Sequence, residues 1–208
     1  MTPFLRLLLV LLACALPLTG LRAADPAAAP PPFQEGKDYV RLSTPVPPSA
    51  PGKAEVIEFF SYRCPHCHEL EGTAQEWLKR KPDNVNFLRI PVAAGFNPDY
   101  ESAARAYYAA EALGVLDKIH RPLFDAIHKE KRNLSTEDQL ATFFAEQGVD
   151  QDAFHKAYKS FQTETRLQRA NQLAQRYRVR GVPAMFVNGQ FEVRSLRIFE
   201  TVDFLLAR

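Results

Sequence analysis

Apolar residues follow two different periods along the chain, and these periods divide it into strands and helices. Residues 55–60, mostly β-branched or aromatic, are typical of a strand buried on both faces. Similar or alternating runs predict shorter strands at 39–42, 85–90, 184–187 and 190–193. A helical period bounded by capping and turn residues predicts helices at about 65–79, 98–112, 116–129, 136–148, 150–158, 162–177 and 196–206.

The order of these elements predicts the fold class. The first long strand, its helix and the next strand form a strand–helix–strand unit, which favours a right-handed crossover and parallel pairing. Asn188-Gly189 between the last two strands predicts a tight hairpin turn. Because strands lie at both ends of this region and only helices lie between them, we expect one α/β domain, formed by 39–96 and 161–208. An all-helical insertion at 97–160 interrupts it.

The first residues have the pattern of an export signal. A basic start at Arg6 precedes a short apolar core, and Ala23 offers a small residue for cleavage. We therefore expect 1–23 to be removed and the Ala/Pro-rich segment 24–38 to be a flexible tether. A plain membrane anchor is the alternative, but the apolar run is short for one. Lipid attachment at Cys14 is another, because Leu-Leu-Ala-Cys resembles a lipoprotein processing site.

Removal of the leader also changes the charge. The full chain carries 26 Lys and Arg against 24 Asp and Glu, and the leader takes two arginines and no acidic residue. The mature chain is therefore neutral and has no basic stripe, which argues against a nucleic-acid partner.

Two cysteines remain after the leader, and their position predicts their chemistry. Cys64 and Cys67 stand three residues apart, between the apolar strand and a helix that begins at Pro65. The unpaired amides of the first helical turn favour a negative charge on the Cys64 sulfur, and His66 adds a donor. We expect Cys64 to be the attacking thiolate. Cys67, one turn further and less exposed, should be the resolving thiol. Stabilising the thiolate makes the Cys64–Cys67 disulfide more oxidising.

Three other interpretations of the motif are open at this point. Cys64 to His68 also fits the attachment pattern of a c-type haem, although no methionine stands out as the far-side ligand. The cysteines and histidines could bind zinc, but no second pair with metal spacing is present. A purely structural bridge would close a very short loop and stabilise little.

Two segments give the redox interpretation a family. Glu58 to Cys67 and Arg180 to Gly189 both strongly resemble periplasmic thiol:disulfide interchange proteins of the DsbA type. The resemblance implies a thioredoxin-like fold with a helical insertion. It implies that Val182-Pro183 is a cis bond facing the cysteines, where Val182 binds an extended substrate strand. It also implies that Glu58 moves protons to and from Cys67 beside a basic partner. That partner is Arg89 here, and since an arginine shares no proton, we expect it to hold Glu58 ionised.

The expected function is that of a protein dithiol oxidase in the periplasm. Its substrates would be newly translocated or unfolded polypeptides with cysteines. The resemblance implies no bound cofactor and reoxidation by a quinone-linked inner-membrane partner of the DsbB type. Alternatives are an isomerase or reductase of the same fold, or a peptide-binding or haem protein. Isomerases of this fold usually carry a separate dimerisation domain before the active-site strand; only a short proline-rich tether and one strand stand there here, which argues against an isomerase. We expect a monomer.

Several conspicuous side chains are expected to have no chemical role. We expect His68 to face solvent or substrate, and the histidines of the insertion to lie at the surface; these are His120, His128 and His155. Trp77 should serve packing. The insertion's core should contain Phe143, Phe144, Phe154 and Phe161.

Overall fold

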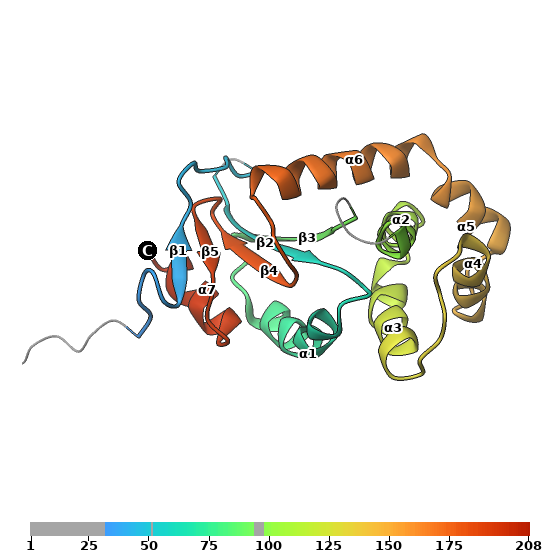
Figure 1. The fold of residues 1–208 in the computed structure, drawn as a ribbon, viewed down its shortest axis with the longest axis horizontal. Helices are drawn as coiled ribbons and strands as arrows, with labels where there is room; N and C mark the ends of the chain where they lie inside the picture. Colours follow the sequence, from blue (N-terminus) through green and yellow to red (C-terminus); the bar gives the residue numbers. More distant parts are fainter. Residues whose placement is uncertain (1–31, 51, 94–97) are drawn as a thin grey trace, which may run out of the picture. The chain divides into compact units, whose positions relative to one another are not determined.

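The computed structural model describes residues 32–50, 52–93 and 98–208, without the side chains of 98 and 99, and 33–208 form one compact unit. Within these residues, five strands form a single sheet in the order β1-β5-β4-β2-β3 (Figure 1). Their bounds are Tyr39–Arg41 (β1), Ala54–Phe60 (β2), Val85–Pro91 (β3), Ala184–Val187 (β4) and Phe191–Val193 (β5). The predicted parallel pairing of β2 with β3 is confirmed, and the other pairs are antiparallel.

In the described part of the chain, seven helices accompany the sheet, at the predicted places and with ends that differ by one or two residues. Their bounds are Pro65–Arg80 (α1), Pro98–Ala112 (α2), Leu116–His128 (α3), Glu137–Glu146 (α4), Gln151–Tyr158 (α5), Phe161–Arg176 (α6) and Ile198–Leu206 (α7). Side-chain caps begin the middle helices as the sequence indicates. Thr136 accepts a hydrogen bond from the Gln139 amide, and Asp150 from the Ala153 amide.

The predicted hairpin turn joins β4 to β5. Asn188 and Gly189 both have positive φ, 52° and 61°, as a tight two-residue turn requires. Gly189 is required for a second reason. Its carbonyl accepts a hydrogen bond from the Val46 amide at 2.8 Å, and a Cβ on it would lie 1.7 Å from the Val46 carbonyl oxygen. The glycine therefore allows 42–46 to pack against the turn.

The helical insertion shares its core with the sheet. Phe60, the last residue of β2, and Tyr62 pack in one apolar cluster with Ile119, Leu123 and Phe124 of α3. Helix α6 packs against α2 and α5 and runs from the end of the insertion back to the sheet (Figure 1). On the other face of the sheet, α1 and α7 cover a cluster that includes Trp77, whose predicted packing role is confirmed. The insertion is thus held to the sheet by a shared apolar core.

Two expectations about apolar side chains are wrong. The predicted tether of 24–38 is wrong from Phe33 onwards, because Phe33 is buried and its ring lies 5.4 Å from that of Phe204. Phe161 is 87% exposed, whereas Phe143, Phe144 and Phe154 form the predicted core. As the first residue of α6, Phe161 projects beyond the helices that would cover it. The predicted leader and Cys14 lie outside the described residues.

Within 32–50, 52–93 and 98–208, no helix is both long enough and apolar enough to span a bilayer.

Candidate active site

Cys64 lies where β2 gives way to α1. It is the N-cap residue of the helix, in an extended conformation, and Pro65 occupies the first helical position, where a missing amide proton costs no hydrogen bond. The Cys64 amide donates to the Ser61 carbonyl at 3.1 Å, which fixes the turn before the helix. Both cysteines are free thiols, so this is the dithiol form. Cys64 is 7% exposed and Cys67 1%, the order that their helix positions predict.

The two thiols have opposite pKa shifts. A hydrogen bond from the Cys67 thiol is the largest influence on Cys64; together with the amides of Cys67 and His66 it outweighs burial and lowers the pKa of Cys64 to about 6. Burial is the largest influence on Cys67 and, with the neighbouring Cys64 sulfur, raises its pKa. Near neutral pH the pair therefore holds one thiolate at the accessible sulfur and one proton at the buried sulfur.

The segment from Arg180 to Gly189 lies beside the cysteines, although it is far from them in the sequence. Val182-Pro183 is a cis peptide bond, as expected. In the neutral thiol form, the Cys64 Sγ donates a hydrogen bond to the Val182 carbonyl oxygen at 3.2 Å, although the two residues lie 118 positions apart. The backbone before Pro183 is therefore within reach of any group bonded to the Cys64 sulfur.

His66 contributes less than the sequence suggests. Its ring points outward, 75% exposed, and Nδ1 hydrogen-bonds Glu69 Oε2 at 3.0 Å. That hydrogen bond and the carboxylate charge raise the pKa of His66, which favours the imidazolium. The charge of the His66 ring lowers the pKa of Cys64 less than the hydrogen bond from the His66 amide does.

Glu58 lies beneath the cysteines in β2 and is 2% exposed. Arg89 is the residue of β3 that pairs with Glu58, and it donates from Nε to Glu58 Oε2 at 3.2 Å. The same guanidinium donates from Nη2 to both oxygens of Glu71, at 3.2 and 3.0 Å. One buried cation is therefore shared by two buried carboxylates.

This sharing corrects the expectation that Arg89 holds Glu58 ionised. Burial is the largest influence on Glu58 and raises its pKa to about 7, with the Glu71 charge acting in the same direction. Arg89 lowers the pKa of Glu58, but not enough to offset burial, because the same guanidinium also binds Glu71. Glu58 therefore titrates near neutrality, as a group that takes and returns protons must.

Glu71 and His120 complete this cluster and were missed from the sequence. Glu71 lies one helical turn after Cys67, on the buried face of α1, and is 1% exposed. His120 is 4% exposed and not at the surface as expected; its Nε2 lies 3.3 Å from Glu71 Oε2, and Tyr62 Oη is 2.7 Å from its Nδ1. Burial lowers the pKa of His120. The signal available in the sequence was an acidic residue within the apolar face of a helix.

His68 also differs from expectation. It faces α3 rather than solvent: its Nε2 lies 2.8 Å from Asp125 Oδ1, and its ring stacks on that of His128 at 5.1 Å. His128 in turn contacts the Tyr62 carbonyl through Nε2 at 2.8 Å, so it too is not simply a surface residue. These histidines attach α1 to the insertion. Among the described residues, no group of three or more His, Cys, Asp or Glu side chains could hold a metal ion.

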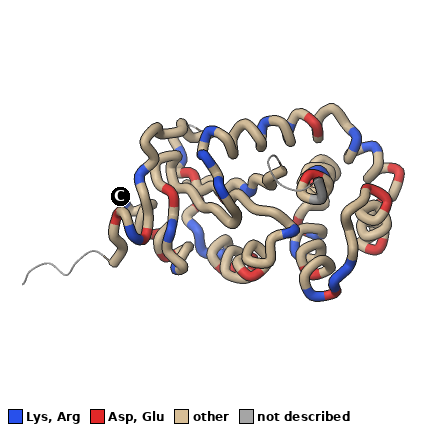
Figure 2. The backbone as a smooth tube through the Cα atoms, viewed as in Figure 1, with Lys and Arg blue, Asp and Glu red and all other residues tan. Residues whose placement is uncertain are grey.

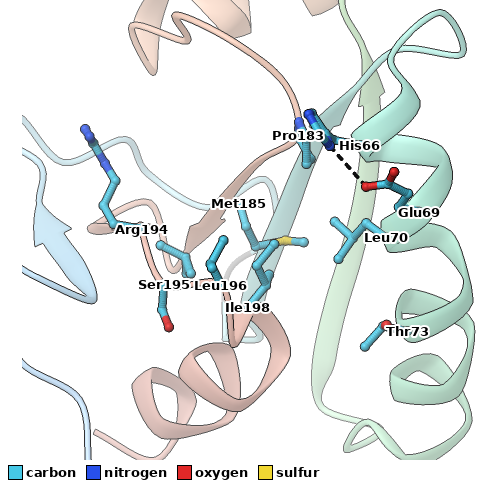
Figure 3. A pocket seen from close by; sticks show the side chains of 11 residues that line it. His66, Glu69, Leu70, Thr73, Pro183, Met185, Arg194, Ser195, Leu196 and Ile198 are labelled. Carbon is cyan, nitrogen blue, oxygen red and sulfur yellow. Dashed lines mark hydrogen bonds and ion pairs between the residues drawn. The ribbon is translucent and has the colours of Figure 1, made fainter.

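A groove of about 520 Å³ is lined by His66, which stands between the two cysteines in the sequence, and by Pro183 of the cis bond. Figure 3 shows His66 and Pro183 together at one end, Leu70 on the α1 side, and Leu196 and Ile198 on the opposite side. Leu196 is fully exposed on its rim. An apolar channel thus leads away from the reactive sulfur.

An activated thiol at a helix N-terminus, a buried partner thiol and a facing cis-proline on this fold define a thiol:disulfide oxidoreductase with a thioredoxin-like fold. Residues 55–205 match the family model described as a DSBA-like thioredoxin domain. The chain belongs to this DsbA family and is a protein dithiol oxidase.

The relatives agree in name. "Thiol:disulfide interchange protein DsbA" of Azotobacter vinelandii is 42% identical over 156 residues, 75% of this chain and 72% of the relative. Its namesake from Burkholderia cepacia is 42% identical over 174 residues, 83% and 79% of the two chains. The crystal structure of Pseudomonas aeruginosa DsbA superposes with a TM-score of 0.78 and 37% identity, over 84% of this chain and 93% of that chain. The isomerase, reductase and haem alternatives are not favoured.

Proposed function

We propose that the protein acts in the periplasm, where it gives its Cys64–Cys67 disulfide to newly exported or unfolded polypeptides that contain cysteines. The low pKa of the Cys64 thiol, held there by donors from Cys67 and the first turn of α1, carries this proposal. A stabilised thiolate favours the reduced form, and a protein whose reduced form is stable is an oxidant. The signal-like pattern of the first 23 residues supports export.

The reaction balances as two thiol–disulfide exchanges. A substrate thiolate attacks the Cys64 sulfur, the Cys64–Cys67 bond breaks, and Cys67 leaves as a thiolate that takes up a proton. A second substrate thiolate then attacks the substrate sulfur of the mixed disulfide, and Cys64 leaves as a stable thiolate. The substrate loses two electrons and the protein gains them.

The proton for Cys67 comes by way of Glu58. The Glu58 charge acts on the pKa of Cys67, and Glu58 itself titrates at about 7. A carboxyl that is partly protonated at the working pH both gives and accepts a proton readily. Glu58 therefore returns a proton to Cys67 as the disulfide opens and takes it up as the disulfide reforms.

An extended substrate segment lies across Pro183. The Val182 backbone, 3.2 Å from the Cys64 sulfur, is placed to pair with the segment next to the reacting cysteine. The groove lined by Leu70, Met185 and Leu196 then receives an apolar side chain of the same segment. Reoxidation requires an outside acceptor of two electrons, and a quinone-linked membrane partner of the DsbB type fits this need without a cofactor in the chain. The protein acts as a monomer in both steps.

The direction of the reaction predicts how stability depends on pH. The pKa of Cys64 falls from its ordinary 9.0 to about 6 on folding. Because the folded-state pKa is depressed, ionisation stabilises the folded dithiol form fully above about 9, and this stabilisation is lost as the pH falls through about 6. The disulfide form lacks this group. We expect the reduced protein to unfold at higher guanidinium concentration than the oxidised protein at about pH 8, with the difference shrinking towards about pH 5.

Denaturation curves of the two forms at a series of pH values measure this difference. A redox equilibrium with glutathione gives the same quantity independently. An oxidised form that is the more stable of the two across the whole pH range would mean that the protein is built to reduce, and the proposed direction would then be wrong.

A further inference from the structure

A second pocket, of about 630 Å³, lies on the other side of the cis-proline from the apolar groove. The two share three lining residues, Pro183, Val193 and Arg194, so they adjoin along the segment that faces Cys64. Any extended chain that crosses Pro183 with one end in the groove therefore passes into or over this second pocket. Its chemistry differs from that of the groove.

Arginines dominate the lining of this pocket. Arg41 comes from β1, Arg194 follows β5, and Arg178 and Arg180 belong to the segment between α6 and β4. In Figure 2 that segment carries successive blue stretches as it descends from α6. The one acidic residue of the lining is Glu192. The pocket therefore has a positive charge that the neutral composition of the mature chain does not reveal.

Two of these arginines are already engaged and two are not. Arg194 donates from Nη2 to Glu192 at 2.8 Å, and Arg41 lies 3.8 Å from Glu35 and over the ring of Phe191. Arg178 and Arg180 are exposed, and neither forms a salt bridge with any residue in the described part of the chain. Their guanidinium groups remain available to a ligand.

Arg178 also occupies a position where arginine is unfavourable for the backbone. It follows the C-cap of α6 with φ of 53°, and the helix ends with hydrogen bonds from Arg178 N to Gln175 O and from Val179 N to Ala174 O. Glycine, or failing that asparagine, is the residue usually found at this left-handed position. An arginine here accepts a conformational cost and places a cation beside the site.

We propose that this pocket, centred on Arg178 and Arg180, binds acidic side chains that flank the reacting cysteine of a substrate polypeptide. The inference rests on the proposed function, since it requires a substrate strand across Val182 and Pro183. A carboxylate is favoured because guanidinium groups pair with it in two-pronged hydrogen bonds. The enzyme therefore prefers cysteines in acidic segments, and the preference depends on salt.

The test compares three dithiol peptides that differ in the residues flanking one cysteine: aspartate and glutamate, asparagine and glutamine, or lysine. We expect the oxidised wild-type protein to oxidise the acidic peptide about three to ten times faster than the neutral one. This is the size of effect that two exposed ion pairs usually contribute. In the double variant Arg178→Asn, Arg180→Gln this ratio falls towards one. Asparagine tolerates the left-handed backbone, so the variant keeps the end of α6.

A matched control removes the same charge elsewhere. The double variant Arg169→Gln, Lys156→Gln replaces two exposed cations on α6 and α5 that do not line the pocket, and its ratio should equal that of the wild type. Binding of the same peptides with serine for cysteine, followed by fluorescence anisotropy, measures recognition without the redox reaction. It separates failure of the inference from failure of the proposed function.

Equal rates and equal affinities for the three peptides would overturn the inference, as would a control variant that loses the preference equally. Binding of vesicles with anionic lipid that depends on Arg178 and Arg180, with no peptide preference, would also overturn it and identify the pocket as a membrane contact. A protein that prefers the acidic serine peptide but oxidises none of the dithiol peptides would instead contradict the proposed function and leave the recognition intact.

Discussion

A Cys67→Ser protein will accumulate mixed disulfides through Cys64, and a Cys64→Ser protein will form essentially none. The Cys64 sulfur is ionised near neutral pH and lies 3.2 Å from the Val182 carbonyl oxygen beside the cis-proline, whereas Cys67 is less exposed and its pKa is raised. Only the first sulfur is both a thiolate and within reach of a polypeptide. We expect disulfide transfer to fall by at least about a thousandfold in Cys64→Ser, as removal of a nucleophile usually causes.

Mass spectrometry after incubation with a glutathionylated peptide measures the trapped species. The variant that lacks both cysteines is the control for adducts formed elsewhere. Rapid adduct formation by Cys64→Ser, through Cys67, would contradict the assignment of the attacking sulfur. So would a Cys67→Ser adduct that forms no faster than the adduct of free glutathione.

Replacing Arg89 by methionine will destabilise the protein by about 3–5 kcal/mol at about pH 8, the usual result of leaving a buried charge unpaired. Glu58 and Glu71 would then lie buried with no cation between them. The pKa of Glu58, already about 7, would rise further, and the pKa of Glu71, now lowered, would rise above the ordinary 4.5. The folded state would then hold more protons than the unfolded state. Stability would therefore decrease as the pH rises from about 4.5, and the defect should be smallest at about pH 5.

Guanidinium denaturation at several pH values measures this effect. Lys79→Met is the control, because it removes an exposed partner of Glu76 and should change stability by less than about 1 kcal/mol. Arg89→Lys should be intermediate, since one ammonium group does not serve two carboxylates as a guanidinium does. A pH-independent defect in Arg89→Met would mean that lost packing, not the shared charge, explains it.

The arrangement of elements was predictable because local signals were strong and agreed. Pro65, Thr136 and Asp150 begin their helices where the sequence indicates, and Asn188-Gly189 forms the hairpin. The reactive cysteine was predictable for the same reason, since its helix position determines its donors.

Contacts between distant segments were not predictable. Glu71 meets Arg89 and His120 only because α1 packs between β3 and α3, and no local pattern specifies that packing. The expectation for Glu58 was wrong for this reason: a second carboxylate competes for the same arginine. The basic pocket likewise depends on the pairing of β1 with β5, which brings Arg41 and Arg194 into the lining of one pocket.

Titration of Cys64 in the reduced protein is the most direct test of whether its sulfur is stabilised as an anion. The ultraviolet absorbance of the thiolate, followed against pH with Cys64→Ser as the blank, gives its pKa. We predict a midpoint of about 6. A midpoint near ~8.5, the value of an ordinary thiol, would contradict the oxidising role assigned to this site.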